Sequence, residues 1–203
     1  MERAHAPVAV VPLGLEGPIW SKVFHVAPLV LVGTLEDDGT TDLAPKHMAM
    51  PLGWQNRYAF VCSPRHATLR NAVARGAFTV SFPRPEQIVE ASLAAGGRAE
   101  DSSKPSLAAL RTFPATVVDG PLVEGCSLWL ECRLERVVDG FGDSVLVVGE
   151  IVAAAAAEDA LRLSDADDAD VIAQSALLAY LSPGRFAAVS ESLSFPFPVD
   201  FRV

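Results

Sequence analysis

Residues 41–71 read T-D-L-A-P-K-H-M-A-M-P-L-G-W-Q-N-R-Y-A-F-V-C-S-P-R-H-A-T-L-R-N and place two short polar loops on either side of an apolar run. The run, residues 58–62, has the length and composition of a β-strand. The second loop, residues 63–68, carries hydroxyl and basic side chains where a helix is expected to begin. Because the first N–H groups of a helix have no partner within it, this arrangement predicts a site for a phosphate group.

The residues before this stretch predict a β-hairpin. Residues 29–35 (L-V-L-V-G-T-L) form an apolar run that leads into E-D-D-G. The dipeptide Asp38-Gly39 is typical of a hairpin turn, since both residues tolerate a positive φ. We therefore expect a second strand over residues 40–44 that ends at Pro45.

The residues after this stretch predict a short helix and another strand. Ser63 can cap the helix, and Pro64 can occupy its first position, where a missing N–H does no harm. Gly76 can end the helix, because glycine readily adopts the left-handed conformation found there. Residues 77–82 (A-F-T-V-S-F) alternate well enough to form the next strand.

The rest of the chain is predicted to be mostly β. We expect strands at 115–118, 128–138 and 144–152, and helices at 85–95 and 171–181. Strands joined mainly by hairpins favour a mainly β fold with inserted helices, arranged as an antiparallel barrel. A doubly wound parallel sheet would need a helix after nearly every strand.

Composition narrows the class of protein. The chain has 203 residues, half of them hydrophobic, and predicts a single domain over residues 1–203, with an arm at 1–24 and a tail at 187–203. The formal net charge of −9 argues against nucleic-acid binding, which needs clustered cations. No apolar stretch has the length of a membrane span, and the N-terminus lacks the layout of a signal peptide. We therefore expect a cytoplasmic protein without a membrane partner.

The sequence contains no obvious catalytic or metal-binding constellation. There is no G-x-S-x-G motif, no G-x-G-x-x-G after a strand, and no metal-ligand spacing among the four histidines. The acidic segment 158–170 lacks the central glycine and the ligand spacing of a calcium loop, so we expect no metal. The three cysteines form no C-x-x-C and are expected to be reduced core thiols. The sequence identifies no catalytic residue.

The ordered set of segments resembles the flavin reductase-like family, whose members bind FMN in a split β-barrel. The resemblance spans roughly residues 26–186. It is carried by T-D-L-A-P-K-H-M (41–48), S-P-R-H-A-T-L-R-N (63–71), A-F-T-V-S-F (77–82), V-E-G-C (123–126), G-D-S-V-L-V-V-G-E-I (142–151) and A-L-L-A-Y-L-S-P-G-R-F (176–186). No single segment is specific, but all occur in the expected order. The resemblance implies an antiparallel split β-barrel of the FMN-binding type.

The resemblance also implies which residues bind the cofactor. The phosphate would be held by Ser63, Arg65 and Thr68, with His66 beside them and Asn71 at the position of a family asparagine. The residues that line the flavin ring would be Ala44, Pro45, Lys46, His47, Met48 and Ala49. Two positions depart from the family pattern: Asp42 replaces a common asparagine, and His47 replaces a common serine. These departures concern the flavin edge and the substrate preference.

The implied function is that of an FMN-dependent oxidoreductase. It would use NADH or NADPH to reduce bound or diffusible flavin or another small-molecule acceptor, and it would form a homodimer. No acid or base of the protein is needed for hydride transfer to a flavin, which agrees with the absence of a catalytic constellation. Two alternatives remain open: a flavin-binding or flavin-transfer protein without turnover, and a split barrel that binds another ligand such as haem or a pyridoxal-type phosphate.

Overall fold

The computed structural model describes residues 9–101, 103–162 and 166–198. The strands are β1 (His25–Pro28), β2 (Val30–Leu35), β3 (Thr41–Lys46), β4 (Ala49–Pro51), β5 (Arg57–Cys62), β6 (Ala77–Phe82), β7 (Thr112–Pro114), β8 (Pro121–Val123), β9 (Leu128–Phe141), β10 (Ser144–Ala156), β11 (Leu177–Ser182) and β12 (Arg185–Val189). The α-helices are α1 (Ala67–Arg75), α2 (Ile88–Leu93) and α3 (Asp168–Gln174). Single 3-10 turns occupy Ile19–Ser21, Pro85–Gln87, Pro105–Ala109 and Glu158–Ala160. Parts of the predicted arm, tail and acidic segment (residues 1–8, 199–203 and 163–165) lie outside the described residues.

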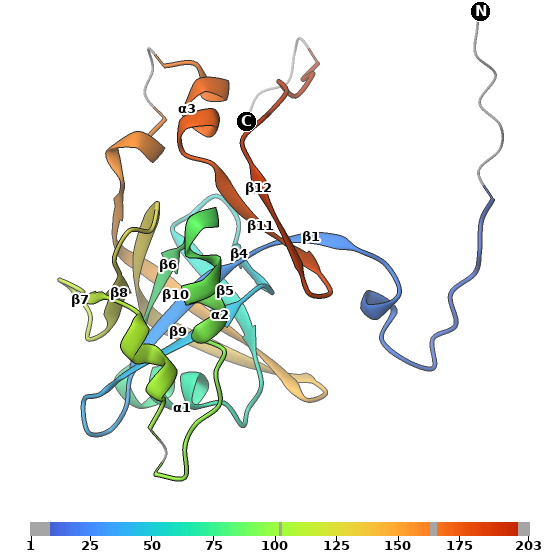
Figure 1. Ribbon diagram of the computed structural model, residues 1–203. Coiled ribbons are helices and arrows are strands. Elements are labelled where there is room, and N and C mark those ends of the chain that lie inside the picture. Colours follow the sequence, from blue (N-terminus) through green and yellow to red (C-terminus); the bar gives the residue numbers. More distant parts are fainter. Residues whose placement is uncertain (1–8, 102, 163–165, 199–203) are drawn as a thin grey trace, which may run out of the picture.

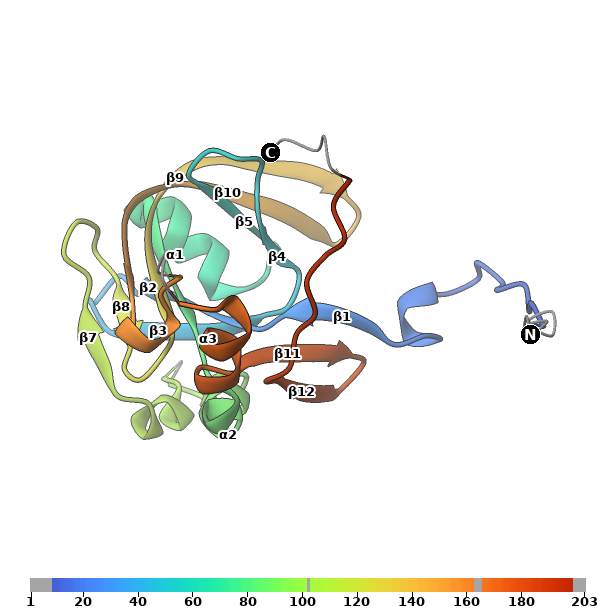
Figure 2. The ribbon, with the colours of Figure 1, turned by 90° about the horizontal axis from the view of Figure 1, so that it is seen from above.

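A seven-stranded sheet in the order β3-β2-β6-β9-β10-β5-β4 forms the body of the molecule. Every pairing in it is antiparallel. The sheet curls into a half-barrel, and the long β9–β10 hairpin forms much of its wall (Figures 1 and 2). A separate three-stranded sheet, β1-β11-β12, stands beside this barrel. The antiparallel split barrel predicted from the sequence is therefore confirmed.

Strand β2 separates two hydrophobic clusters. Val30 and Val32 face the barrel interior, where they pack with aromatic residues such as Phe60 and Phe78. Leu31 lies on the opposite face, in a cluster that includes residues of α2. Because successive strand residues point to opposite faces, a strand buried on both sides reads as a continuous apolar run. This explains why β2 was recognisable from sequence.

Helix α1 packs against β2, β3 and β6 and starts later than predicted. Its N-cap is His66 and not Ser63, whose hydroxyl instead accepts a hydrogen bond from the Arg65 N–H at 3.3 Å. The Ser63 side chain thus closes a local turn. Such side-chain to backbone hydrogen bonds offer the backbone an alternative to the helix. The predicted end of the helix is confirmed, since Gly76 has φ +65°.

Three other predictions about elements are wrong or incomplete. Strand β3 continues through Pro45, which is tolerated because β3 lies at the edge of the sheet. The predicted strand at 115–118 is a bend whose backbone N–H groups donate to the buried carboxylate of Glu131. The predicted helix at 171–181 ends at Gln174, and residues 177–182 form β11.

The described residues contain no helix long and apolar enough to cross a membrane.

Candidate functional site

A cavity of about 410 Å³ lies where β3 ends, α1 begins and the loop after α2 passes by. We call it the helix-start cavity. Strand β3 contributes one wall, which includes Ala44, Pro45 and Lys46. Arg65, His66, Ala67 and Thr68 line a second wall at the start of α1, and residues 94–98 with Lys104 line the third. The second loop that the sequence singled out lines this cavity at 65–68, whereas the first loop, around 46–50, contributes only Lys46.

The helix-start cavity is built to attract an anion. The side chain of the N-cap residue, His66, makes no capping hydrogen bond, so the start of α1 presents backbone N–H groups there. The buried hydroxyl of Thr68 lies in the same turn. Arg65, Lys46, Arg98 and Lys104 add four cationic side chains to the lining. Such donors and charges together are suited to a phosphate.

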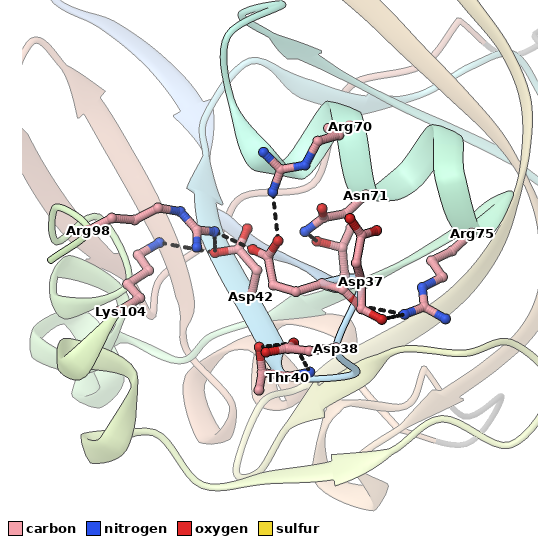
Figure 3. A network of polar contacts seen from close by, with 11 residues as sticks. Asp37, Asp38, Thr40, Asp42, Arg70, Asn71, Arg75, Arg98 and Lys104 are labelled. Carbon is pink, nitrogen blue, oxygen red and sulfur yellow. Dashed lines mark hydrogen bonds and ion pairs between the residues drawn. The ribbon is translucent and has the colours of Figure 1, made fainter. Parts of the chain in front are cut away.

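Asp42 lies within ion-pair distance of two of these cations, Arg98 and Lys104. Its side chain is only 3% exposed, and its carboxylate lies 2.9 Å from the Arg98 guanidinium and 3.7 Å from the Lys104 ammonium. Figure 3 shows Arg98 and Lys104 reaching Asp42 from the loop that follows α2. Lys104 also donates to the Leu43 carbonyl at 2.6 Å. Burial lowers the pKa of Lys104, and the nearby Asp42 opposes that shift.

A second carboxylate, that of Glu36, also pairs with cations of this network. Glu36 forms ion pairs with both Arg98 and Arg70. Burial acts to raise the pKa of Glu36, but hydrogen bonds from Asn71, Arg98 and Arg70 lower it overall. Asn71 is 1% exposed and donates to the Thr34 hydroxyl at 3.3 Å. It is not among the residues that line the helix-start cavity.

Lys46 connects the helix-start cavity to a buried thiol. Its ammonium lies 3.7 Å from the Cys62 sulfur, which is 3.9 Å from Nδ1 of His66. Burial raises the pKa of Cys62, and the charge of Lys46 only partly opposes this. Burial also lowers the pKa of His66, as do the charges of Lys46 and Arg65. Cys62 is thus a neutral thiol at neutral pH, as expected for a core cysteine, and the other two cysteines are likewise buried and free.

A second cavity adjoins the first. It lies between α2 and the β11–β12 hairpin, and we call it the hairpin cavity. Pro45 and Ala95 line both cavities, so the two share a wall. His47 lines the hairpin cavity and packs against Tyr180, with ring centroids 4.9 Å apart.

The structure distributes the predicted site residues as follows. Six of them line the helix-start cavity: Ala44, Pro45, Lys46, Arg65, His66 and Thr68. His47 lines the hairpin cavity. Met48 is half exposed, Ala49 is buried in the barrel core, and Ser63 and Asn71 do not line either cavity.

Sequence reasoning missed Arg98, Lys104 and the 94–97 segment. Residues 94–95 end the helix predicted at 85–95, and Arg98 and Lys104 follow in a polar segment that no periodicity or motif marks. The one available signal was the unusual acidic residue Asp42, because a buried carboxylate needs a cationic partner. That signal does not reveal which cation of the chain pairs with it.

Comparisons with known proteins place the chain by family and fold. A family model described as flavin reductase like domain matches residues 24–173. A curated relative from Methanothermobacter thermautotrophicus, an uncharacterized protein, is 26% identical over 132 residues, or 62% of this chain. The match covers 61% of that relative, so the chain spans about three fifths of its length.

Solved structures share the fold. The flavoredoxin of Desulfovibrio vulgaris (Miyazaki F) superposes with a TM-score of 0.75 at 24% identity, covering 93% of this chain and 99% of that one. Nitrilotriacetate monooxygenase component B from Bacillus cereus superposes with a TM-score of 0.76 at 19% identity, covering 95% of this chain and 100% of that one. At these identities the likeness concerns the fold alone.

Proposed function

This chain belongs to the flavin reductase-like family, and from that membership we propose that it binds FMN and takes electrons from NADH or NADPH. The electrons reduce bound or diffusible flavin or another small acceptor. One observation carries the choice of ligand: the helix-start cavity combines an uncapped helix start, a buried hydroxyl and four cationic side chains at the end of β3.

The residues present fit a flavin phosphate and a planar ring. Arg65, Thr68 and the N–H groups at the start of α1 would hold the phosphate, with Arg98 and Lys104 supplying charge from the opposite wall. The small residues Ala44 and Pro45 leave a smooth wall on which a ring can lie. When bound, the flavin supplies the hydride chemistry, while the protein supplies binding, orientation and electrostatics.

We also propose that the protein is a homodimer. Residues 9–24 extend away from the barrel (Figures 1 and 2) and expose large apolar side chains, including Val10, Leu15 and Phe24. The tail exposes Leu193, Phe195 and Phe197. Apolar segments of this size favour burial against another surface, and a second copy would offer one. Light scattering of the purified protein should give twice the chain mass, and a single chain mass would contradict the dimer.

The visible absorption spectrum tests the proposed function. We expect added FMN to give protein-associated flavin bands that bleach when NADH or NADPH is added without oxygen. Bands that persist with both nicotinamides would instead indicate a flavin-binding or flavin-transfer protein. If FMN does not bind at all, the helix-start cavity holds another ligand and the proposal is wrong.

Two substitutions test the assignment of the phosphate end. Arg65→Ala and Thr68→Ala should each weaken FMN binding by roughly tenfold, the effect of losing one hydrogen bond to a charged group. Riboflavin, which has no phosphate, should bind the Arg65 variant and the native protein equally. Circular dichroism should show both variants folded. If both variants retain native FMN affinity, the phosphate lies elsewhere.

A further inference from the structure

The hairpin cavity differs in chemistry from the helix-start cavity beside it. Its volume is about 410 Å³, and much of its lining is apolar, including Leu29, Ile88 and Phe186. Two aromatic rings, those of His47 and Tyr180, face each other at one side with an interplanar angle of 39°. Apolar walls and aromatic rings favour a flat, apolar ligand.

The Tyr180 side chain is fixed in place. Its hydroxyl accepts a hydrogen bond from the Gly184 N–H at 2.9 Å, across the turn between β11 and β12. Tyr180 also pairs with Phe186 across the two strands. A ring on a paired strand whose hydroxyl is hydrogen-bonded offers a stacking surface that loses little freedom when a ligand binds.

The charge of the hairpin cavity is also distinctive. Arg185 lines it and is exposed, and the described residues provide no ion-pair partner for its guanidinium. The lining includes no carboxylate among those residues, although the whole chain carries a net charge of −9. By contrast, a third cavity, beside the β2–β3 turn, mixes four acidic residues with three basic ones: Glu36, Asp37, Asp38, Asp101, Arg70, Arg98 and Lys104. Burial lowers the pKa of His47, so Arg185 is the cation that this lining presents at neutral pH.

We propose that the hairpin cavity binds a small planar aromatic monocarboxylate, whose ring packs beside His47 and Tyr180 while Arg185 pairs with its carboxylate. The cavity lies at the lower end of ligand-pocket volumes, which suits one or two fused rings and not a dinucleotide. A planar guanidinium matches the two oxygens of one carboxylate. Through Pro45 and Ala95 the ligand would lie next to the flavin site. Its part in turnover, as the second reactant, rests on the proposed function, but its binding does not.

Calorimetric titration with two matched probes tests this site. The probes are 2-naphthoate and its neutral analogue 2-naphthamide, each added to the full chain with and without bound FMN. We expect naphthoate to bind the native protein and Arg185→Gln to weaken it by roughly tenfold, while naphthamide binds both forms equally. Arg185→Lys should weaken naphthoate binding less than Arg185→Gln does, because lysine keeps the positive charge.

Two further variants locate the site. Arg133→Gln removes an exposed arginine on β9, outside the hairpin cavity, and should leave naphthoate affinity unchanged. Ser92→Phe narrows the hairpin cavity from α2 and should weaken both probes. The inference is overturned if naphthoate does not bind, if acid and amide bind the native protein alike, if Arg185→Gln has no effect, or if FMN displaces naphthoate. If naphthoate binds as expected but FMN does not bind, the proposed function fails and this inference stands.

Discussion

Replacing Asp42 by asparagine tests the charge network of the helix-start cavity. The substitution removes one negative charge, keeps an oxygen that can accept a hydrogen bond, and restores the residue that the family resemblance leads one to expect. Asp42 is almost fully buried, with Arg98 at 2.9 Å and Lys104 at 3.7 Å. After the change, Lys104 would lose this carboxylate and Arg98 would keep only its ion pair with Glu36.

The size of the effect follows from these distances. At an effective dielectric constant of about 20, unit charges 2.9 Å apart attract each other by roughly 6 kcal/mol. The cost of burying the carboxylate offsets much of this attraction, and the amide oxygen keeps part of the hydrogen bonding. We therefore expect Asp42→Asn to lower the free energy of unfolding of the ligand-free protein by about 2–3 kcal/mol.

The same change should strengthen the binding of a phosphate. In the native protein, Asp42 competes with the ligand for Arg98 and Lys104, and in the variant a bound phosphate replaces the charge that Asp42 supplied to them. FMN should therefore stabilise Asp42→Asn by more than it stabilises the native protein. Riboflavin should stabilise both by the same amount, because it carries no phosphate.

Urea unfolding followed by tryptophan fluorescence measures these quantities, with and without each ligand. Asp139→Asn removes an exposed carboxylate from the far end of β9 and serves as the matched control. It should change the free energy of unfolding by less than about 0.5 kcal/mol. The reasoning is refuted if Asp42→Asn is as stable as this control, or if FMN stabilises native and variant proteins equally.

Two further predictions concern the barrel itself. Gly149→Ala should lower the free energy of unfolding by about 1–3 kcal/mol, because its new Cβ would lie 2.6 Å from the fully buried ring of Phe78. The control is Gly17→Ala, whose new Cβ would meet no atom within 4 Å. Equal stability of the two variants would contradict the packing argument. Glu131→Gln should cost about 1–3 kcal/mol at neutral pH, because the backbone N–H groups at 116–118 lose a charged acceptor. Burial acts to raise the pKa of Glu131, but these hydrogen bonds lower it overall. The stability that the Glu131 carboxylate contributes is therefore present above the unfolded-state pKa near 4.5, and it is lost as pH falls through the lower folded-state pKa. Urea unfolding between pH 7 and pH 3 should show native and Glu131→Gln stabilities converging in acid, and a constant difference would contradict this assignment.

The sequence determined the elements whose signals are local. The apolar runs of β2, β5 and β6, and the left-handed end of α1 at Gly76, follow from residue size and backbone preference alone. The order of these elements, and their resemblance to a known family, also located residues 44–46 and 65–68, which line the helix-start cavity.

Only the tertiary structure decided the rest. The apolar run at 177–182 fits a helix or a strand equally well, and pairing with β1 and β12 makes it a strand. In the same way, Arg98 and Lys104 lie 56 and 62 residues after Asp42, in a segment with no repeating pattern. They become part of the site because a buried carboxylate requires cations, and the fold carries the loop after α2 to that carboxylate.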